Sequence, residues 1–243
     1  MKSKLLNATS TALLAALCGA GSVHAAAPPG QLDHGLIDIR YQNTYAGVTT
    51  QLHLPLAAGP GGLSVGIYDF QRRNAETLAP EGSFLAYCVD PWQWASSNYH
   101  TYETRLLSAS PLAHDAARYA NVVRLFGHAY ADSLGDQIKA AGFQLALWEA
   151  FNDDGDLYNG AVRVTSGTHG AVTGAAQSLL GQLDTWGAAP TTYELTLFSN
   201  SGYQDYLAVT ATFASAAPEP GSYAMLLAGL GLLTWVVRRR NKA

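Results

Sequence analysis

The stretch GFQLALWEAF at residues 142–151 carries the most informative pattern in this 243-residue chain. Four of its residues fall at positions i, i+3, i+4 and i+7 and so share one face of a predicted helix: Gln144, Leu147, Trp148 and Phe151. A glutamine on this apolar face needs a partner, because an unsatisfied buried amide costs roughly 1 to 3 kcal/mol. Either Gln144 bonds to nearby backbone or its amide is chemically changed.

The segments on either side of this helix show strand periodicity, so the predicted fold class is α+β. Alternating runs lie before residue 88 and again near the C-terminus: IDIRYQ, TTQLHL, LSVGIYDF, YELTLFSN and YLAVTATF. The middle of the chain is helical, with one helix starting at Ser110-Pro111 and a second running from about Asp136 to Phe151. We expect β-strands, in a sandwich or barrel-like arrangement, to flank this central helical segment.

Both ends of the chain read as targeting segments. Residues 1–25 contain Lys2 and Lys4, an apolar run and a small-residue cleavage site, which is typical of a secretory signal removed by signal peptidase. Cys18 lies within this segment, so the mature chain keeps Cys88 as its one cysteine. We therefore predict three parts: a signal peptide at 1–25, one domain at 26–214 and a sorting segment at 215–243.

The C-terminal segment has a defined order of features. Pro218, Glu219 and Pro220 precede an apolar run at 221–237, and an arginine cluster follows. By itself this pattern indicates a short membrane anchor with its basic end in the cytoplasm. It also resembles the PEP-CTERM signal of Gram-negative bacteria, which implies processing by an exosortase and release to the cell surface or an exopolysaccharide matrix. A plain permanent anchor is the alternative.

The charge of the predicted mature region argues against nucleic acid as a partner. Residues 26–220 contain 18 acidic and 8 basic side chains, giving a net charge near −10. Only Lys139 among these basic residues is a lysine. A general preference for arginine in the genome would explain the shortage of lysine. Another explanation is that a domain with a reactive electrophile is safer with few amines of its own.

Three segments together resemble a known family: AYCVD (86–90), ARYANVVRLFGHAY (117–130) and FQLALWEAFNDDG (143–155). Their order and helical context are similar to the thioester domains of Gram-positive surface adhesins. The resemblance implies that Cys88 is joined by an internal thioester to Gln144 of a Gln-x-Ala-x-Trp motif. Phe143 replaces the usual threonine of that motif, and His128-Ala129 depart from the pattern after the first helix.

A thioester is lost to water, so it needs a closed apolar site with one approachable side. We expect four aromatic residues to enclose it: Tyr87, Trp92, Trp94 and Trp148. Ordinary core packing is the alternative for these residues. Such a protein reacts once and does not turn over, so we predict no enzymatic activity.

Other sites have weaker support in the sequence. A cysteine hydrolase would need a histidine beside Cys88, and the candidates are His100, His114, His128 and His169. The acidic run at 152–156 lacks the alternating spacing of a calcium loop, which favours a turn after the helix. We predict no metal and no cofactor.

These patterns predict an exported surface or biofilm-matrix protein that attaches covalently, through a Cys88–Gln144 thioester, to an amine or hydroxyl of an envelope protein or polysaccharide. The alternative is a non-covalent structural protein of the exopolysaccharide envelope in which Cys88 is reduced and buried. Contact with the membrane is expected only through the C-terminal segment.

Overall fold

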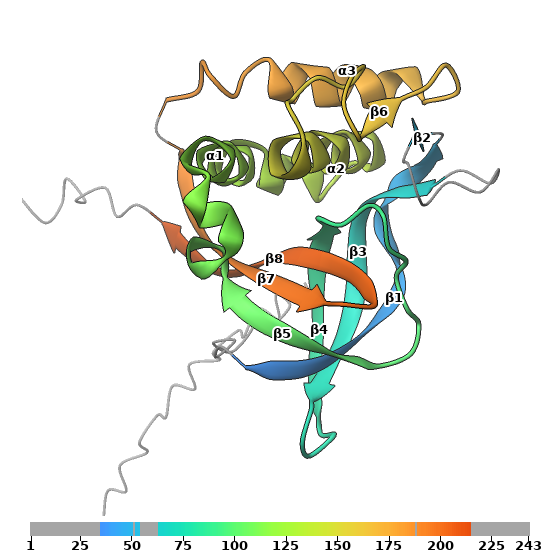
Figure 1. Ribbon diagram of the computed structural model, residues 1–243, viewed down its shortest axis with the longest axis vertical. Coiled ribbons are helices and arrows are strands. Elements are labelled where there is room, and N and C mark those ends of the chain that lie inside the picture. The colour runs from blue at the N-terminus through green and yellow to red at the C-terminus, as the bar shows by residue number, and fades with distance from the viewer. Residues whose placement is uncertain (1–34, 51, 54–62, 188, 215–243) are drawn as a thin grey trace, which may run out of the picture.

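The fold is mixed α+β, with a closed antiparallel barrel and three α-helices packed against it (Figure 1). The computed structural model describes residues 35–50, 52–53, 63–187 and 189–214. The predicted fold class is confirmed, and the barrel is the arrangement adopted. The predicted signal peptide and sorting segment lie outside the described residues, as do positions 51 and 54 of the predicted strand TTQLHL.

The elements alternate from strands to helices and back to strands. The strands are β1 (Leu36–Thr50), β2 (Leu52–His53), β3 (Leu63–Asn74), β4 (Pro80–Cys88), β5 (His100–Leu106), β6 (Arg163–Val164), β7 (Thr191–Asn200) and β8 (Tyr203–Ala214). The helices are the 3₁₀ turns η1 (Leu107–Ala109) and η2 (Pro111–His114), then α1 (Ala116–Ser133), α2 (Gln137–Asn152) and α3 (Gly170–Leu180).

Six strands close the barrel in the order β1-β3-β4-β8-β7-β5, and β5 pairs back onto the start of β1. The β3–β4 register ends at the pair Tyr68 and Ala86, whereas β4 pairs with β8 as far as Cys88 and Tyr206. The rings of Tyr68 and Phe70 contact Tyr206 across β4. Because β3 and β8 are not adjacent, this contact places these rings on the inner side of the barrel.

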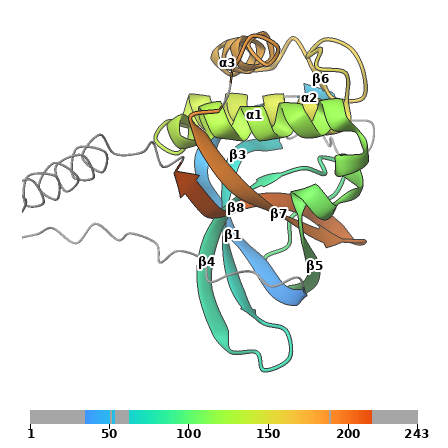
Figure 2. The same ribbon diagram turned by 90° about the vertical axis from the view of Figure 1, so that its left-hand side faces the viewer.

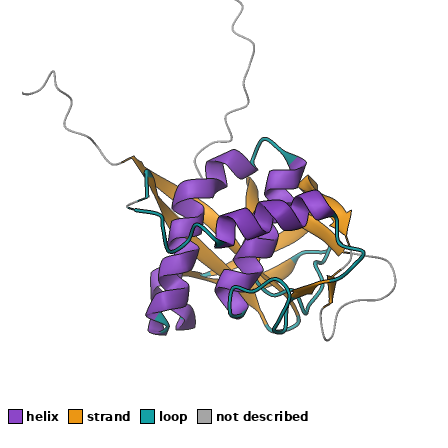
Figure 3. Cartoon of the chain, turned by 90° about the horizontal axis from the view of Figure 1, so that it is seen from above, coloured by secondary structure: helices purple, strands orange, loops and turns teal. Residues whose placement is uncertain are grey.

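The helices cover the outer side of the same strands. Tyr87 alternates with Cys88 along β4, and its ring lies 4.5 Å from that of Phe143 on α2. Figures 1 and 2 show α1 and α2 side by side over the barrel, with α3 forming a further layer on α2, and Figure 3 shows these helices from above. A Cβ atom at Gly142 would lie 2.6 Å from the Cβ of Ala175, so glycine permits the close approach of α2 and α3.

The two long helices begin where a side chain caps them. Asp136 accepts a hydrogen bond from the backbone N–H of Lys139 at the start of α2, in agreement with the predicted helix. The predicted helix start at Ser110-Pro111 holds for the short 3₁₀ turn η2, which has Ser110 at its N-cap position and Pro111 in its first turn. The Ser110 hydroxyl donates to the carbonyl of Leu107 rather than capping this turn, and the long helix α1 begins only at Ala116, with Asp115 as its cap.

Within the described ranges, no helix has the length and apolar character needed to cross a membrane. The apolar run at 221–237 lies outside those ranges.

Candidate functional site

Cys88 is the last residue of β4, and it is fully buried at the point where β3 and β4 part. On one side the strand pairing with β8 continues, since the N–H of Val89 donates to the carbonyl of Asp205 at 2.9 Å. On the other side the register with β3 has already ended at Ala86. The backbone N–H and C=O of Cys88 therefore need partners from another element.

The side chain of Gln144 supplies both partners. The N–H of Cys88 donates to Oε1 of Gln144 at 2.9 Å, and Nε2 of Gln144 donates to the carbonyl oxygen of Cys88 at 2.7 Å. The amide thus occupies the position of a neighbouring strand residue, although the two residues are 56 positions apart in sequence. Gln144 is also fully buried. The structure brings together the two residues that the sequence analysis paired.

The sulfur of Cys88 lies in a dry environment. Its S–H donates to the carbonyl oxygen of Asp90 at 3.2 Å. Burial raises the pKa of the thiol well above its usual value, and the indole of Trp148 opposes this shift by favouring the thiolate. The indole N–H is buried and makes no hydrogen bond to nitrogen or oxygen, so Trp148 presents an unused donor beside the sulfur.

The four predicted aromatic residues take different positions. Trp148 is 1% exposed and lies one helical turn after Gln144, and Trp92 is partly buried against the core. Trp94 is 60% exposed and does not enclose the pair. Tyr87 faces the helices on the opposite side of β4 from Cys88, where its hydroxyl donates to Ser133 at 2.7 Å. The structure thus brings Trp148 to the pair but directs Tyr87 and Trp94 elsewhere.

Glu149 follows Trp148 and is a buried acid without a hydrogen-bond partner at either carboxyl oxygen. Burial and the nearby charges of the loop at 153–156 raise its pKa to about 8, so the carboxyl is largely neutral at pH 7. The backbone N–H of Gly155 lies near the Glu149 carboxyl and slightly opposes the rise in its pKa, but it does not form a well-aligned hydrogen bond to either oxygen. Glu149 is a feature that sequence analysis missed, because a single acid inside an apolar helix gives no functional signal.

The acidic loop after α2 is held by its own backbone. Asp153 accepts hydrogen bonds from the N–H groups of Ala161 and Val162, and Asp156 accepts from Tyr158. Among the described residues, no group of three or more histidine, cysteine or acidic side chains could hold a metal ion. The loop has the contacts of a structural turn.

Two of the candidate histidines make side-chain contacts away from Cys88. His100 bonds to Ser96 and stacks on Tyr203, and His128 stacks on Trp186. His114 ends η2, and His169 precedes α3. The part of the chain that the structure describes offers no hydrogen bond between any of these rings and the thiol.

The C-terminus carries a PEP-CTERM protein-sorting motif. The match spans residues 216–240, which include Pro218, Glu219 and Pro220. The motif implies an exported protein that is sorted to the cell surface and processed by an exosortase. No protein of curated function matches the chain in sequence.

The fold is similar to solved N-terminal domains of surface proteins. The thioester domain of a Clostridium perfringens surface protein is 12% identical with a TM-score of 0.42, covering 74% of this chain and 100% of that one. The thioester domain of the Streptococcus pyogenes fibronectin-binding protein SfbI is 15% identical with a TM-score of 0.37, covering 58% and 84%. The N-terminal domain of the S. pyogenes pilus tip adhesin Cpa is 12% identical with a TM-score of 0.41, covering 71% and 92%.

Proposed function

We propose that this surface-sorted protein forms an internal thioester between Cys88 and Gln144 and uses it to attach covalently to material of the cell envelope. The observation that carries the proposal is the pair of hydrogen bonds between the Gln144 amide and the Cys88 backbone inside a fully buried site. These bonds hold the carboxamide against the residue that carries the nucleophile, which is the proximity that an intramolecular acyl transfer requires.

The same bonds suit the chemistry of bond formation. The sulfur of Cys88 attacks the side-chain carbonyl carbon of Gln144, and the carbonyl oxygen takes up negative charge while it accepts the Cys88 N–H. The unused indole N–H of Trp148 lies beside the sulfur and favours its anionic form. When the tetrahedral intermediate collapses, the carbon–nitrogen bond breaks, and the nitrogen leaves as ammonia with the proton of the thiol.

Burial has opposite effects on forming and keeping the bond. It raises the pKa of Cys88, which makes the thiolate scarce, so bond formation is slow and relies on the fixed geometry. It also keeps water from the finished thioester. A slow reaction that occurs once per molecule is compatible with this balance, whereas repeated turnover is not.

The thioester would be an acyl donor toward an amine or hydroxyl on an envelope protein or polysaccharide. Attack on the Gln144 carbon releases the Cys88 thiol and leaves an amide or ester to the target. An amide is a much poorer acyl donor than a thioester, so capture of an amine is effectively irreversible.

A second candidate function has its own support. The two hydrogen bonds to Cys88 also satisfy an unreacted Gln144, so its burial alone does not require a covalent bond. On this alternative the protein is a non-covalent structural component of the envelope, and Cys88 remains a buried thiol.

Intact mass separates the two candidates. The exported protein, with its two ends established by peptide mapping, should be lighter than its sequence by one ammonia. Cys88→Ser and Gln144→Ala should each restore the full mass, whereas Gln182→Ala, at an exposed glutamine on the same domain, should keep the deficit. A wild-type protein of full mass, whose denatured form is alkylated at Cys88, would favour the non-covalent function.

A further inference from the structure

A pocket, which we call the helix pocket, opens on the outer side of the helices. Its volume is about 350 Å³, and its lining residues come from α1, α2, α3 and the segment that follows α3. Figures 1 and 2 show α3 lying over the other two helices, on the side that faces away from the barrel. Neither Cys88 nor Gln144 lines this pocket. It is large enough for a small ligand and is separate from the proposed thioester.

The inner part of the helix pocket is apolar, and its rim is polar. Phe143, which is fully buried, and Leu179, which is partly buried, supply carbon surface inside the pocket. Asp132, Lys139 and Ser178 also line it, and all three side chains are exposed. Their polar groups can therefore meet a ligand that enters from solvent. A ligand that fits this pocket has an apolar face and polar groups around its edge.

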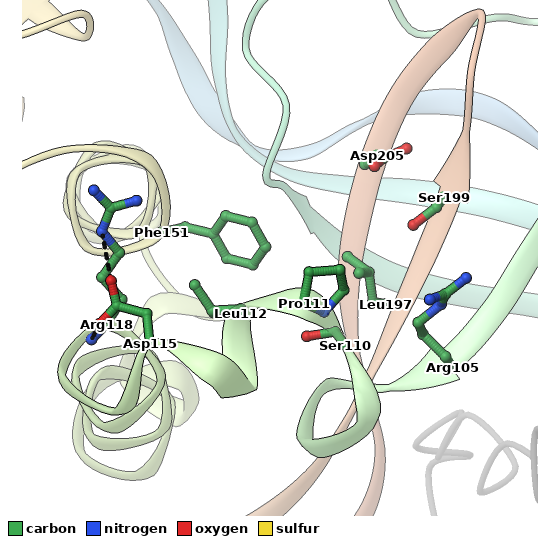
Figure 4. Close-up of a pocket in the computed structure, with 10 residues that line it drawn as sticks. All are labelled: Arg105, Ser110, Pro111, Leu112, Asp115, Arg118, Phe151, Leu197, Ser199 and Asp205. Carbon is green, nitrogen blue, oxygen red and sulfur yellow. Dashed lines mark hydrogen bonds and ion pairs between the residues drawn. The ribbon is translucent and has the colours of Figure 1, made fainter.

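The charges on the rim balance each other. Nζ of Lys139 lies 3.3 Å from Oδ2 of Asp132, and no other lysine, arginine, aspartate or glutamate occurs among the described residues that line the pocket. A charged ligand of either sign would meet a like charge there. Figure 4 shows a different pocket, between the barrel and the helix ends, whose walls carry two arginines and two aspartates. The balanced rim of the helix pocket favours an uncharged ligand.

One wall of the helix pocket is an aromatic ring held in place by its surroundings. Trp186 stacks on His128 with ring centroids 4.6 Å apart and planes inclined by 7°. Nε2 of His128 lies 3.3 Å from the carbonyl oxygen of Gly187, the next residue along. The same segment packs closely on α1, where a side chain at Gly127 would collide with Ala189. The indole is thus fixed before a ligand arrives, which lowers the entropy cost of binding.

We propose that the helix pocket binds one hexose unit of an uncharged polysaccharide. A pyranose ring has C–H groups on its faces and hydroxyl groups around its edge, so it can pack on Trp186 while its hydroxyls reach the rim. Asp132 accepts hydrogen bonds, Lys139 donates them and Ser178 does both. An apolar peptide side chain would use the inner part of the pocket but none of these groups. The sorting motif places the protein at the cell surface, where it can meet such polymers.

This binding goes beyond the proposed covalent function, because it is reversible and needs no thioester. A single hexose is a small ligand with few contacts, so its Kd should be about 1 mM. A polysaccharide repeats the unit many times, and many copies of the protein on one surface can bind the same polymer. The overall attachment is then stronger than that of any single pocket.

The test compares neutral with acidic sugars of the same shape. The exported protein is mixed with methyl glucoside, methyl galactoside or methyl mannoside, and binding is measured by saturation-transfer NMR and by calorimetry. At least one of the three should bind with a Kd of about 1 mM. Its uronate counterpart, in which a carboxylate replaces the primary alcohol, should bind at least about threefold more weakly, because the carboxylate competes with Asp132 for Lys139.

Two arginine substitutions on α3 provide a matched pair. Ser178 and Gln177 are neighbouring exposed residues, but only Ser178 lines the helix pocket. Arginine is a strong helix former, so both variants should fold. In Ser178→Arg the long side chain fills the mouth of the pocket and should abolish saturation transfer to the glycoside. Gln177→Arg should bind within about twofold of wild type, as expected for a surface change outside the site.

Trp186→Ala removes the wall on which the sugar packs and should weaken binding at least about fivefold. A smaller loss in the folded variant, continued binding by Ser178→Arg, or an equal loss in Gln177→Arg would overturn the assignment. So would a uronate that binds as tightly as the neutral sugar. Saturation transfer to N-acetylphenylalanine amide, but to none of the glycosides, would assign the pocket to a peptide side chain instead. The intact mass of the same samples reports the thioester separately, so either proposal can fail alone.

Discussion

Replacing Cys88 by serine should separate a cross-linked from an unlinked protein by stability alone. In an unlinked protein the serine hydroxyl can donate to the Asp90 carbonyl as the thiol does. The cost is then that of one exchanged buried hydrogen bond, about 1 kcal/mol. A cross-linked protein has no thiol to exchange, and the substitution instead opens a loop between partners 56 residues apart. In the chain-entropy treatment used for disulfides, a cross-link of that span contributes about 4 kcal/mol.

Gln144→Ala provides an internal comparison. It removes the cross-link and also leaves the N–H and C=O of Cys88 without partners in a buried site. Each unpaired group costs about 1 to 3 kcal/mol, so this variant should be less stable than Cys88→Ser whether or not the thioester forms. The informative quantity is therefore the loss in Cys88→Ser relative to wild type.

Urea unfolding measures these differences, provided that the wild-type mass is recorded on the same preparation. A loss near 4 kcal/mol in Cys88→Ser, with an ammonia-deficient wild type, is the expected result. A loss of about 1 kcal/mol in a fully deficient preparation would refute the cross-link estimate. The same small loss in a preparation of full mass would refute the thioester.

Three further predictions concern other parts of the chain. The pKa of Glu149 is raised to about 8 in the folded protein, whereas in the unfolded chain the carboxyl ionises near its ordinary pKa of 4.5. The free energy of unfolding should therefore fall as the pH rises from 4.5 to about 8. Glu149→Gln should remove that pH dependence in urea titrations. Phe151→Ala, which removes a ring packed against the core on the helical face of Gln144, should admit water and speed hydrolysis of the proposed thioester, seen as faster gain of one water by mass spectrometry. In a host with an exosortase, the protein should lose the residues after about Pro220, and full-length protein retained in the inner membrane would contradict the sorting prediction.

Local sequence patterns were sufficient to predict the fold class, whereas the closure of the barrel and the position of α3 depend on contacts between distant segments. The alternating runs and the helical face of residues 142–151 are properties of neighbouring residues, and both correspond to elements of the structure. Closure of the barrel depends on β5 pairing with β1, which no local pattern reveals. The helix α3 was missed because its glycines and alanines carry little amphipathic signal, and its place depends on the fit of Ala175 against Gly142.

In the candidate site, too, some features follow from local sequence patterns and others depend on contacts between distant segments. Strand alternation alone places Tyr87 and Cys88 on opposite faces, so the sequence could have excluded Tyr87 as a wall of the site. The exposure of Trp94 depends on the loop after β4 and could not be read from its neighbours. The pocket lined by Phe151, Leu197 and Asp205 was not predicted, because its residues come from several elements that are far apart in sequence.

The one lysine of the predicted mature region lies on the same helix as Gln144 but does not face it. Lys139 lies in the first turn of α2, where its ammonium pairs with Asp132, and Gln144 follows five residues later. At about 100° per residue the two side chains differ by roughly 140° around the helix axis. Lys139 therefore does not point toward the Gln144 carbonyl carbon while the fold is intact. If the proposed thioester forms, it persists only where amines of its own domain are kept away, and the position of Lys139 on another face of α2 provides that separation.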